Sequence, residues 1–174
     1  MAHLVTPRLQ LVAITVPLVE AVLEADRRRA EEILAVPCPA AWPNRALVER
    51  AFYASIDAIR RDPGCRLWGD RVMITRESPR VVGSVIFHGA PDHEGAVEVA
   101  YGVEEDSQRQ GYATEATQRC VEWALEQPGV TVVRAATPPW HLASQRVLTR
   151  CGLVRVGERD SPLGELWEYE RRRG

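Results

Sequence analysis

The sequence predicts a mixed α/β fold in which helices flank one central, mostly antiparallel sheet, with the element order βααβββαβαββ. Two observations support this class. Segments with the two-residue alternation of strands are interleaved with segments whose apolar residues recur every three or four positions, as on a helix. A strand, a tight loop and a helix also follow one another directly between Val97 and Glu126, and a further strand follows this helix. A right-handed crossover makes those two strands parallel.

The first part of the chain is predicted to contain one strand and two helices. Thr15 is a candidate helix cap, and Pro17 fits the first turn of the helix after it. Asn44 is a candidate cap for a second helical pattern, which stops before the Pro63-Gly64 pair. The predicted elements are a strand at 9–13, a helix from about 17 to 35, a proline-rich break around Trp42 and a second helix from 44.

Strands dominate the rest of the chain. The turn Glu77-Ser78-Pro79-Arg80 joins two strands as a hairpin, and Gln127-Pro128-Gly129 ends the long helix. Gly152 closes a short helix near the end of the chain. The predicted strands are 66–76, 81–88, 97–103, 130–136, 153–158 and 165–170, with the short helix from about 141 to 150.

Length and composition indicate one ordinary domain over residues 1–174. The formal net charge of -2 disfavours general binding to nucleic acid or to an acidic membrane. The four cysteines lie far apart, with no histidine at ligand spacing, so we expect neither a metal site nor a disulfide framework. No secretion signal or membrane-spanning run is recognisable, which favours the cytoplasm.

The loop that opens the long helix has the properties of an anion-binding site. Gly111 and Ala113 leave the first amides of the helix uncovered, and these amides lie at the positive end of the helix dipole. The loop lacks the lysine of the P-loop pattern and the three glycines of the Rossmann pattern. A phosphate site and plain helix capping therefore both remain open interpretations of these residues.

A six-residue signature and two more distant segments carry a family resemblance. Gln108-Arg109-Gln110-Gly111-Tyr112-Ala113 fits the pattern Q/R-x-x-G-x-G/A, and Thr114-Glu115-Ala116 continues it. This pattern resembles the one with which GNAT-superfamily N-acetyltransferases bind the pyrophosphate of acetyl-CoA. Thr6-Pro7-Arg8-Leu9 resembles the opening of the Rim-type branch, the ribosomal-protein N-acetyltransferases, and Ser144-Gln145-Arg146-Val147-Leu148 with Cys151-Gly152-Leu153 resembles its closing segment.

The resemblance implies an acetyl-CoA-dependent N-acetyltransferase with a GNAT-like fold, whose central parallel strands splay at the cofactor site. The acceptor would be a primary amine, on a protein or peptide N-terminus or on a small molecule, that attacks the thioester directly in a ternary complex. The cofactor-binding residues that the resemblance implies are Gln108, Arg109, Gln110, Gly111, Tyr112, Ala113 and Thr114 for the pyrophosphate, and Gly102, Val103, His141 and Ser144 for pantetheine and the thioester.

Two residues are implied to move protons. Glu98 matches the general-base glutamate of several relatives; burial would give its carboxylate the raised proton affinity that this role needs, whereas an exposed Glu98 would be only a polar strand residue. Leu148 replaces the tyrosine that many relatives use as the acid. Rim-type relatives use a serine instead, here Ser144, while His141 replaces the asparagine of that pattern. His141 as a proton shuttle and Ser144 as a simple helix cap are the alternatives.

The acceptor site and the assembly are the least constrained features. Trp42 and Trp68 are candidates to line an amine pocket, with plain packing in the core as the alternative. Neither Cys120 nor Cys151 occupies a recognisable nucleophile position, so no covalent acetyl-enzyme is expected. The chain is expected to be a monomer or a homodimer. A non-catalytic acyl-CoA-binding module, with a regulatory or interaction role, is the alternative function.

Overall fold

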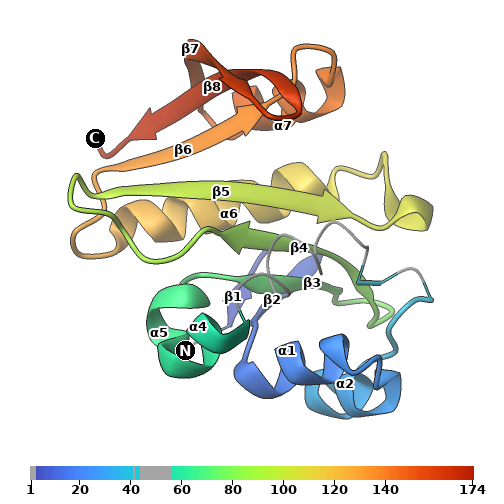
Figure 1. The fold of residues 1–174 in the computed structure, drawn as a ribbon. Helices are drawn as coiled ribbons and strands as arrows, with labels where there is room; N and C mark the ends of the chain where they lie inside the picture. Colours follow the sequence, from blue (N-terminus) through green and yellow to red (C-terminus); the bar gives the residue numbers. More distant parts are fainter. Residues whose placement is uncertain (1–2, 41, 44–55) are drawn as a thin grey trace.

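The computed structural model describes residues 3–40, 42–43 and 56–174. One eight-stranded sheet, with the order β1-β2-β3-β4-β5-β6-β8-β7, lies at the centre of this part of the chain (Figure 1). All neighbouring pairs in it are antiparallel except β5 with β6, which confirms the predicted mixed, mostly antiparallel sheet. The strands are β1 (Leu4–Val5), β2 (Leu9–Ala13), β3 (Arg71–Thr75), β4 (Val81–Phe87), β5 (Ala96–Val103), β6 (Val132–Thr137), β7 (Val154–Ser161) and β8 (Gly164–Arg172).

The parallel pair divides the sheet into two halves. β5 and β6 pair over only three positions, the last of which joins Glu98 with Arg134. β5 nevertheless continues to Val103 and β6 to Thr137, and the two strands diverge beyond their paired ends (Figure 1). We call these diverging, unpaired edges the strand split. It agrees with the splayed strands that the family resemblance implied.

Helices cover both faces of the sheet. α6 contributes the buried residues Ala116, Cys120, Val121 and Ala124 to a core cluster on one face. α1, α2 and α4 bury residues in a second cluster on the opposite face, which includes Ile59 of α4. The helices are α1 (Val16–Leu23), α2 (Arg27–Leu34), α4 (Ile56–Arg61), α5 (Pro63–Arg66), α6 (Tyr112–Glu126) and α7 (Leu142–Arg150).

The single helix predicted from 17 to 35 is wrong, because two helices occupy this stretch. Ala25 has a left-handed backbone conformation (φ +54°), which an α-helix cannot continue through. Asp26 then caps α2, since its side chain accepts a hydrogen bond from the Arg29 amide at 3.0 Å. The start of α2 at Asp26 was therefore not predicted from the sequence.

The predicted strand start at Arg66 is also wrong. Asp62 caps a short helix by accepting a hydrogen bond from the Cys65 amide at 3.1 Å, and Pro63 occupies the first turn of this helix. The proline that was predicted only to end one helix therefore begins another. The strand β3 starts later, at Arg71.

Smaller differences concern short elements and strand ends. β1 and a 3-10 turn, η3 (Glu105–Ser107), were not predicted, because two or three residues are too few to show a period. β7 and β8 extend further than predicted and meet at a tight turn, where the Ser161 hydroxyl donates to the Gly164 carbonyl at 2.7 Å. Residues 44–55 of the second predicted helix lie outside the described residues. Within the described ranges, no helix combines the length and apolar character needed to cross a membrane.

Candidate functional site

The predicted anion loop lies between the end of β5 and the start of α6. Arg109 (φ +61°) and Gly111 (φ +81°) have left-handed backbone conformations, which turn the exposed loop into the helix. Gly111 is the N-cap of α6, and no side-chain cap bond covers the first helical amides among the described residues. The loop therefore presents N–H groups at the positive end of a 15-residue helix, which is the arrangement that binds phosphate.

Acidic residues precede the loop, and one of them is paired with an arginine. Burial, reinforced by the charge of Asp106, raises the pKa of Glu104. A hydrogen bond from Ser107, followed by the contact with Arg80, lowers the pKa of Asp106. Arg80 Nη1 lies 3.1 Å from the Asp106 carboxylate and neutralises it. Arg80 thus offsets part of the negative charge that precedes the loop.

An N-terminal segment clasps the loop through contacts that sequence reasoning missed. Glu115, in the first turn of α6, accepts hydrogen bonds from the Thr6 hydroxyl (2.6 Å), the Arg8 amide (2.8 Å) and Arg8 Nε (2.7 Å). Arg8 Nη1 also donates to the Gln110 carbonyl at 2.7 Å, and its guanidinium lies 4.7 Å from the Tyr112 ring centre. We call this group the Arg8 clasp. Thr6 is 109 positions from Glu115, so no local spacing could reveal it.

Glu115→Gln is expected to lower stability in a pH-dependent way. Burial alone would raise the pKa of Glu115, but the hydrogen bonds from Thr6 and Arg8 outweigh it and lower that pKa. A carboxylate with a depressed pKa stabilises the fold above its unfolded value of about 4.3, and this contribution is lost as the pH falls through the folded value. Urea unfolding should give a free-energy loss of about 1.5–3 kcal/mol at neutral pH.

The same measurement at low pH separates the clasp from a general effect of the substitution. The difference between wild type and Glu115→Gln should shrink as the pH falls below about 4.3. Glu32→Gln is the matched control, because Glu32 also pairs with an arginine on a helix, Arg28, but is largely exposed. We expect this control to change stability by less than about 0.5 kcal/mol. Equal losses in the two variants would contradict the clasp.

The backbone amides of β5 face alternately toward β4 and toward the strand split. The Glu104 amide donates to the Val82 carbonyl at 2.8 Å, and the His88 amide donates to the Glu98 carbonyl at 3.0 Å, so even-numbered residues bond to β4. The Gly102 N–H therefore faces β4 rather than the split, which removes it from the expected cofactor contacts. The Val103 and Tyr101 N–H groups face the split instead, and Tyr101 was not predicted for this position.

Glu98 lies where the split begins, as the last residue of β5 that pairs with β6. Its side chain is 45% exposed, so Glu98 does not have the buried position that was considered for the general base. Arg159 Nη2 of β7 lies 3.9 Å from the Glu98 carboxylate instead. Glu98 and Arg159 line an open groove of about 440 Å³ on the face opposite α6. Other charged residues in this groove are Arg134, Glu168 and Glu170.

The start of α7 brings Ser144 and His141 together at the split. His141 is the N-cap, because its Nδ1 accepts a hydrogen bond from the Ser144 amide at 3.4 Å, so the interpretation of Ser144 as the cap is wrong. His141 is exposed and stacks on the Trp140 ring. The Ser144 hydroxyl lies 2.9 Å from the Tyr101 hydroxyl of β5. Leu148, at the position of the missing tyrosine, is buried in the core.

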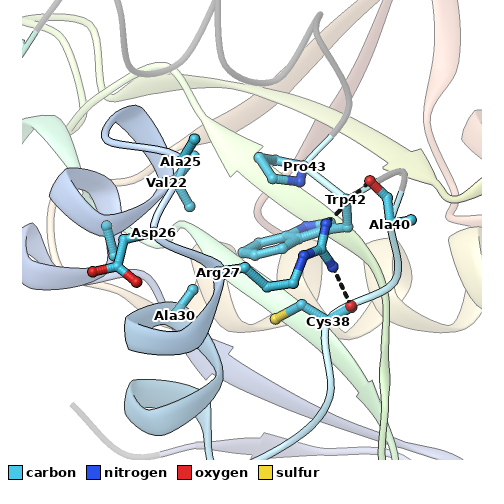
Figure 2. A pocket seen from close by; sticks show the side chains of 10 residues that line it. Val22, Ala25, Asp26, Arg27, Ala30, Cys38, Ala40, Trp42 and Pro43 are labelled. Carbon is cyan, nitrogen blue, oxygen red and sulfur yellow. Dashed lines mark hydrogen bonds between the residues drawn. The ribbon is translucent and has the colours of Figure 1, made fainter.

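Trp42 and Trp68 do not share a pocket. Trp68 packs against Phe87 and Trp123 in the cluster under α6, whereas Trp42 is buried in the cluster on the opposite face. Trp42 lines a pocket of about 270 Å³ between α1, α2 and the proline-rich segment (Figure 2). The Arg27 guanidinium donates hydrogen bonds to the Cys38 carbonyl at 2.5 Å and to the Ala40 carbonyl at 3.2 Å. Figure 2 shows Arg27 held between these two carbonyl groups.

The three buried cysteines are poor nucleophiles in this structure. Burial raises the pKa of Cys120 and of Cys151 to about 12, and that of Cys38 to about 11. Cys151 Sγ instead donates a weak hydrogen bond to the Thr114 carbonyl at 3.6 Å. The described residues contain no group of three or more His, Cys, Asp or Glu side chains that could hold a metal ion.

Comparisons with known proteins agree with this architecture. The family described as acetyltransferase (GNAT) domain matches residues 8–154. The uncharacterized N-acetyltransferase YjdG of Bacillus subtilis (strain 168) is 28% identical over 154 residues, which cover 88% of this chain and 90% of the relative.

Solved structures share the fold over nearly the whole chain. A ribosomal-protein-S5-alanine acetyltransferase from Vibrio fischeri has a TM-score of 0.69 at 14% identity and covers 99% of this chain and 97% of its own. RimL, a ribosomal L7/L12 α-N-protein acetyltransferase solved in complex with coenzyme A, has a TM-score of 0.65 at 16% identity and covers 97% and 96%.

Proposed function

Because the chain belongs to the GNAT acetyltransferase family, we propose that it transfers the acetyl group of acetyl-CoA to a primary amine by direct attack in a ternary complex. The observation that carries this proposal is the pairing of an anion loop with a strand split beside it. The loop suits a pyrophosphate and the split suits an extended pantetheine chain. The family relation makes the chain an acyltransferase, while the acceptor and the roles of individual residues belong to the proposal.

The loop and the split supply the binding and electrostatic parts of the reaction. The amides from Arg109 to Thr114 would hold the pyrophosphate. A Cβ on Gly111 would lie 3.3 Å from Arg8 Nη2, so the absence of a side chain keeps this cradle open. When acetyl-CoA is bound, it supplies the activated thioester. The Val103 and Tyr101 N–H groups would stabilise the oxyanion that forms during attack, at about 3 kcal/mol per donor.

Glu98 would take the proton from the attacking amine. It lies at the point where the strands separate, and its exposed carboxylate is open to the groove. Arg159, 3.9 Å away, would hold this carboxylate in place at the groove, since a base must lie close to the proton that it removes. The proton would leave through water, because the groove is open to solvent.

The groove favours a positively charged acceptor. Three carboxylates (Glu98, Glu168 and Glu170) and two guanidinium groups (Arg134 and Arg159) line it, which leaves an excess of one negative charge. An amine is mostly protonated before it reacts, so this excess attracts it to the place where Glu98 removes its proton. The fold neighbours named for ribosomal proteins favour a protein or peptide N-terminus, with small-molecule amines as the other class.

A second candidate is a non-catalytic module that binds acyl-CoA. The observation that favours it is Leu148, which is buried where many relatives have the catalytic tyrosine, together with His141 in place of an asparagine. Calorimetry with acetyl-CoA and a thiol-release assay separate the two functions. The amine panel should include peptides with free and blocked N-termini, a polyamine and an aminoglycoside.

Each outcome of these assays supports one function. The proposal expects binding of acetyl-CoA and thiol release that depends on an unblocked amine. Binding without any thiol release, even by slow hydrolysis, would support the binding module and overturn the enzyme. The absence of binding would overturn both and leave an interaction domain that retains only the fold.

Ser144→Ala is expected to lower kcat about tenfold, while the Kd of acetyl-CoA stays nearly unchanged. The reason is that the Ser144 hydroxyl would stabilise the departing thiolate, which the ground state does not contain. Thr149→Ala is the matched control, since it removes another hydroxyl from α7 at an exposed position. A wild-type kcat for Ser144→Ala would exclude Ser144 from the reaction.

A further inference from the structure

Tyr101 makes a contact across the strand split that none of the assigned roles explains. It belongs to the part of β5 that pairs with β4 but no longer with β6, and its ring packs against the core cluster under α6. Its hydroxyl reaches the first turn of α7, where it lies 2.9 Å from Ser144 Oγ and 3.1 Å from the Ser144 carbonyl. This hydroxyl contact therefore joins the two halves of the sheet beside the residue assigned to the leaving group.

The direction of the hydrogen bond between the two hydroxyl groups decides where the Ser144 hydrogen points. Each hydroxyl carries one hydrogen. If the Tyr101 hydrogen goes only to the Ser144 carbonyl, the short contact between the two hydroxyls requires Ser144 to donate to Tyr101. If Tyr101 donates to Ser144 Oγ, the Ser144 hydrogen is free for another acceptor. Only in the second arrangement can the Ser144 hydroxyl donate a hydrogen bond to a thiolate.

The acidity of Tyr101 favours an orienting role over a proton-donating one. Burial raises the pKa of Tyr101 to about 12, because the hydrogen bond with Ser144 lowers this pKa by less than burial raises it. Tyr101 therefore stays protonated and available as a hydrogen-bond donor over the whole working range of an enzyme. Full proton transfer from it to a thiolate of ordinary pKa, about 8.5, would be unfavourable by roughly three powers of ten.

We propose that Tyr101 is a positioning residue that acts through Ser144: it donates to Ser144 Oγ and thereby directs the Ser144 hydrogen toward the departing sulfur. The inference rests on the proposed function. During the reaction the amine nitrogen bonds to the acetyl carbon, and the carbon–sulfur bond breaks with its electron pair on sulfur. Ser144 stabilises the thiolate by a hydrogen bond without losing its proton. The amine proton leaves through Glu98 to water, and the thiolate then takes a proton from water.

Three variants test the inference: Tyr101→Phe, Ser144→Ala and the double variant. Tyr101→Phe keeps the ring and its packing and removes only the hydroxyl. We expect it to lower kcat about tenfold, with the Kd of acetyl-CoA changed by less than about twofold. Because Tyr101 acts through Ser144, the double variant should be no slower than Ser144→Ala alone. Thr117→Val, which removes another buried hydroxyl, here from α6, and keeps the shape of the side chain, is the control and should keep the wild-type rate.

The outcomes separate this inference from the proposed function. A wild-type kcat for Tyr101→Phe, a loss seen only in the Kd of acetyl-CoA, or losses that multiply in the double variant would each overturn the role of Tyr101 alone. The proposed function would survive all three. If wild-type protein releases no thiol with any amine, the proposed function fails and the inference fails with it.

Discussion

Replacing Gly111 by valine is expected to weaken acetyl-CoA binding by at least about a hundredfold, because two or more charge-assisted hydrogen bonds of about 1.5–3 kcal/mol each would be lost. Gly111 has φ +81°, a conformation that costs a residue with a side chain about 1–2 kcal/mol. A β-branched side chain would also crowd Arg8 Nη2, which lies 3.3 Å from the position of a Cβ. Relief of this strain would turn the loop amides away from the pyrophosphate.

Gly129→Val is a closely matched control for this prediction. Gly129 also has φ +81°, but no atom lies within 4 Å of a Cβ at its position, and it lies in the loop after α6. Both variants should lose similar stability in thermal unfolding, while only Gly111→Val should lose affinity in calorimetry. If both bind acetyl-CoA equally well, the loop does not hold the pyrophosphate.

The order of helices and strands from β3 onward could be predicted because it depends on local patterns. The apolar spacing of Ala116, Cys120 and Ala124 gives one buried face, and these residues are indeed buried against the sheet. The loop could be predicted for the same reason, since Gly111 and the helix after it are adjacent in sequence. The parallel pairing of β5 with β6 follows from the crossover through α6.

Contacts between distant segments could not be predicted in this way. The Arg8 clasp joins Thr6 and Arg8, which precede β2, to the start of α6, and neither partner shows an unusual spacing. The exposure of Glu98 depends on a groove whose other charged residues come from β6, β7 and β8. Strand alternation places the Glu98 side chain on the opposite face of the sheet from those of Val97 and Val99. It does not show which of the two faces is open to solvent. The helix break at Ala25 is local, yet alanine itself favours helices.

Tyr101 illustrates the same limit at the proposed site. In the sequence, Tyr101 lies on the same side of the strand as the apolar residues Val97 and Val99, and nothing else marks it. Only the divergence of β5 from β6 creates the space across which its hydroxyl reaches Ser144. Backbone alternation likewise decides that Val103, and not Gly102, offers its amide to the split. Residue types near a motif thus identify the candidates, whereas the register of the sheet selects among them.

Glu98→Gln is expected to lower kcat about a hundredfold or more, in line with the contribution of general-base catalysis. Glutamine has nearly the same shape and keeps an oxygen that can accept from Arg159, but it cannot take a proton from the amine. Glu98 lies at the start of the split and outside the pyrophosphate loop, so the Kd of acetyl-CoA should stay nearly unchanged. Steady-state thiol release and calorimetry measure the two quantities separately.

Glu158→Gln is the control for the loss of one paired carboxylate from this half of the sheet. Glu158 is exposed on β7 and pairs with Arg155 at 2.9 Å, but it does not line the groove. Its substitution should leave kcat unchanged. If Glu98→Gln keeps the wild-type kcat between about pH 6 and 9, water alone must deprotonate the amine. The groove would then orient the acceptor through its charges without removing its proton.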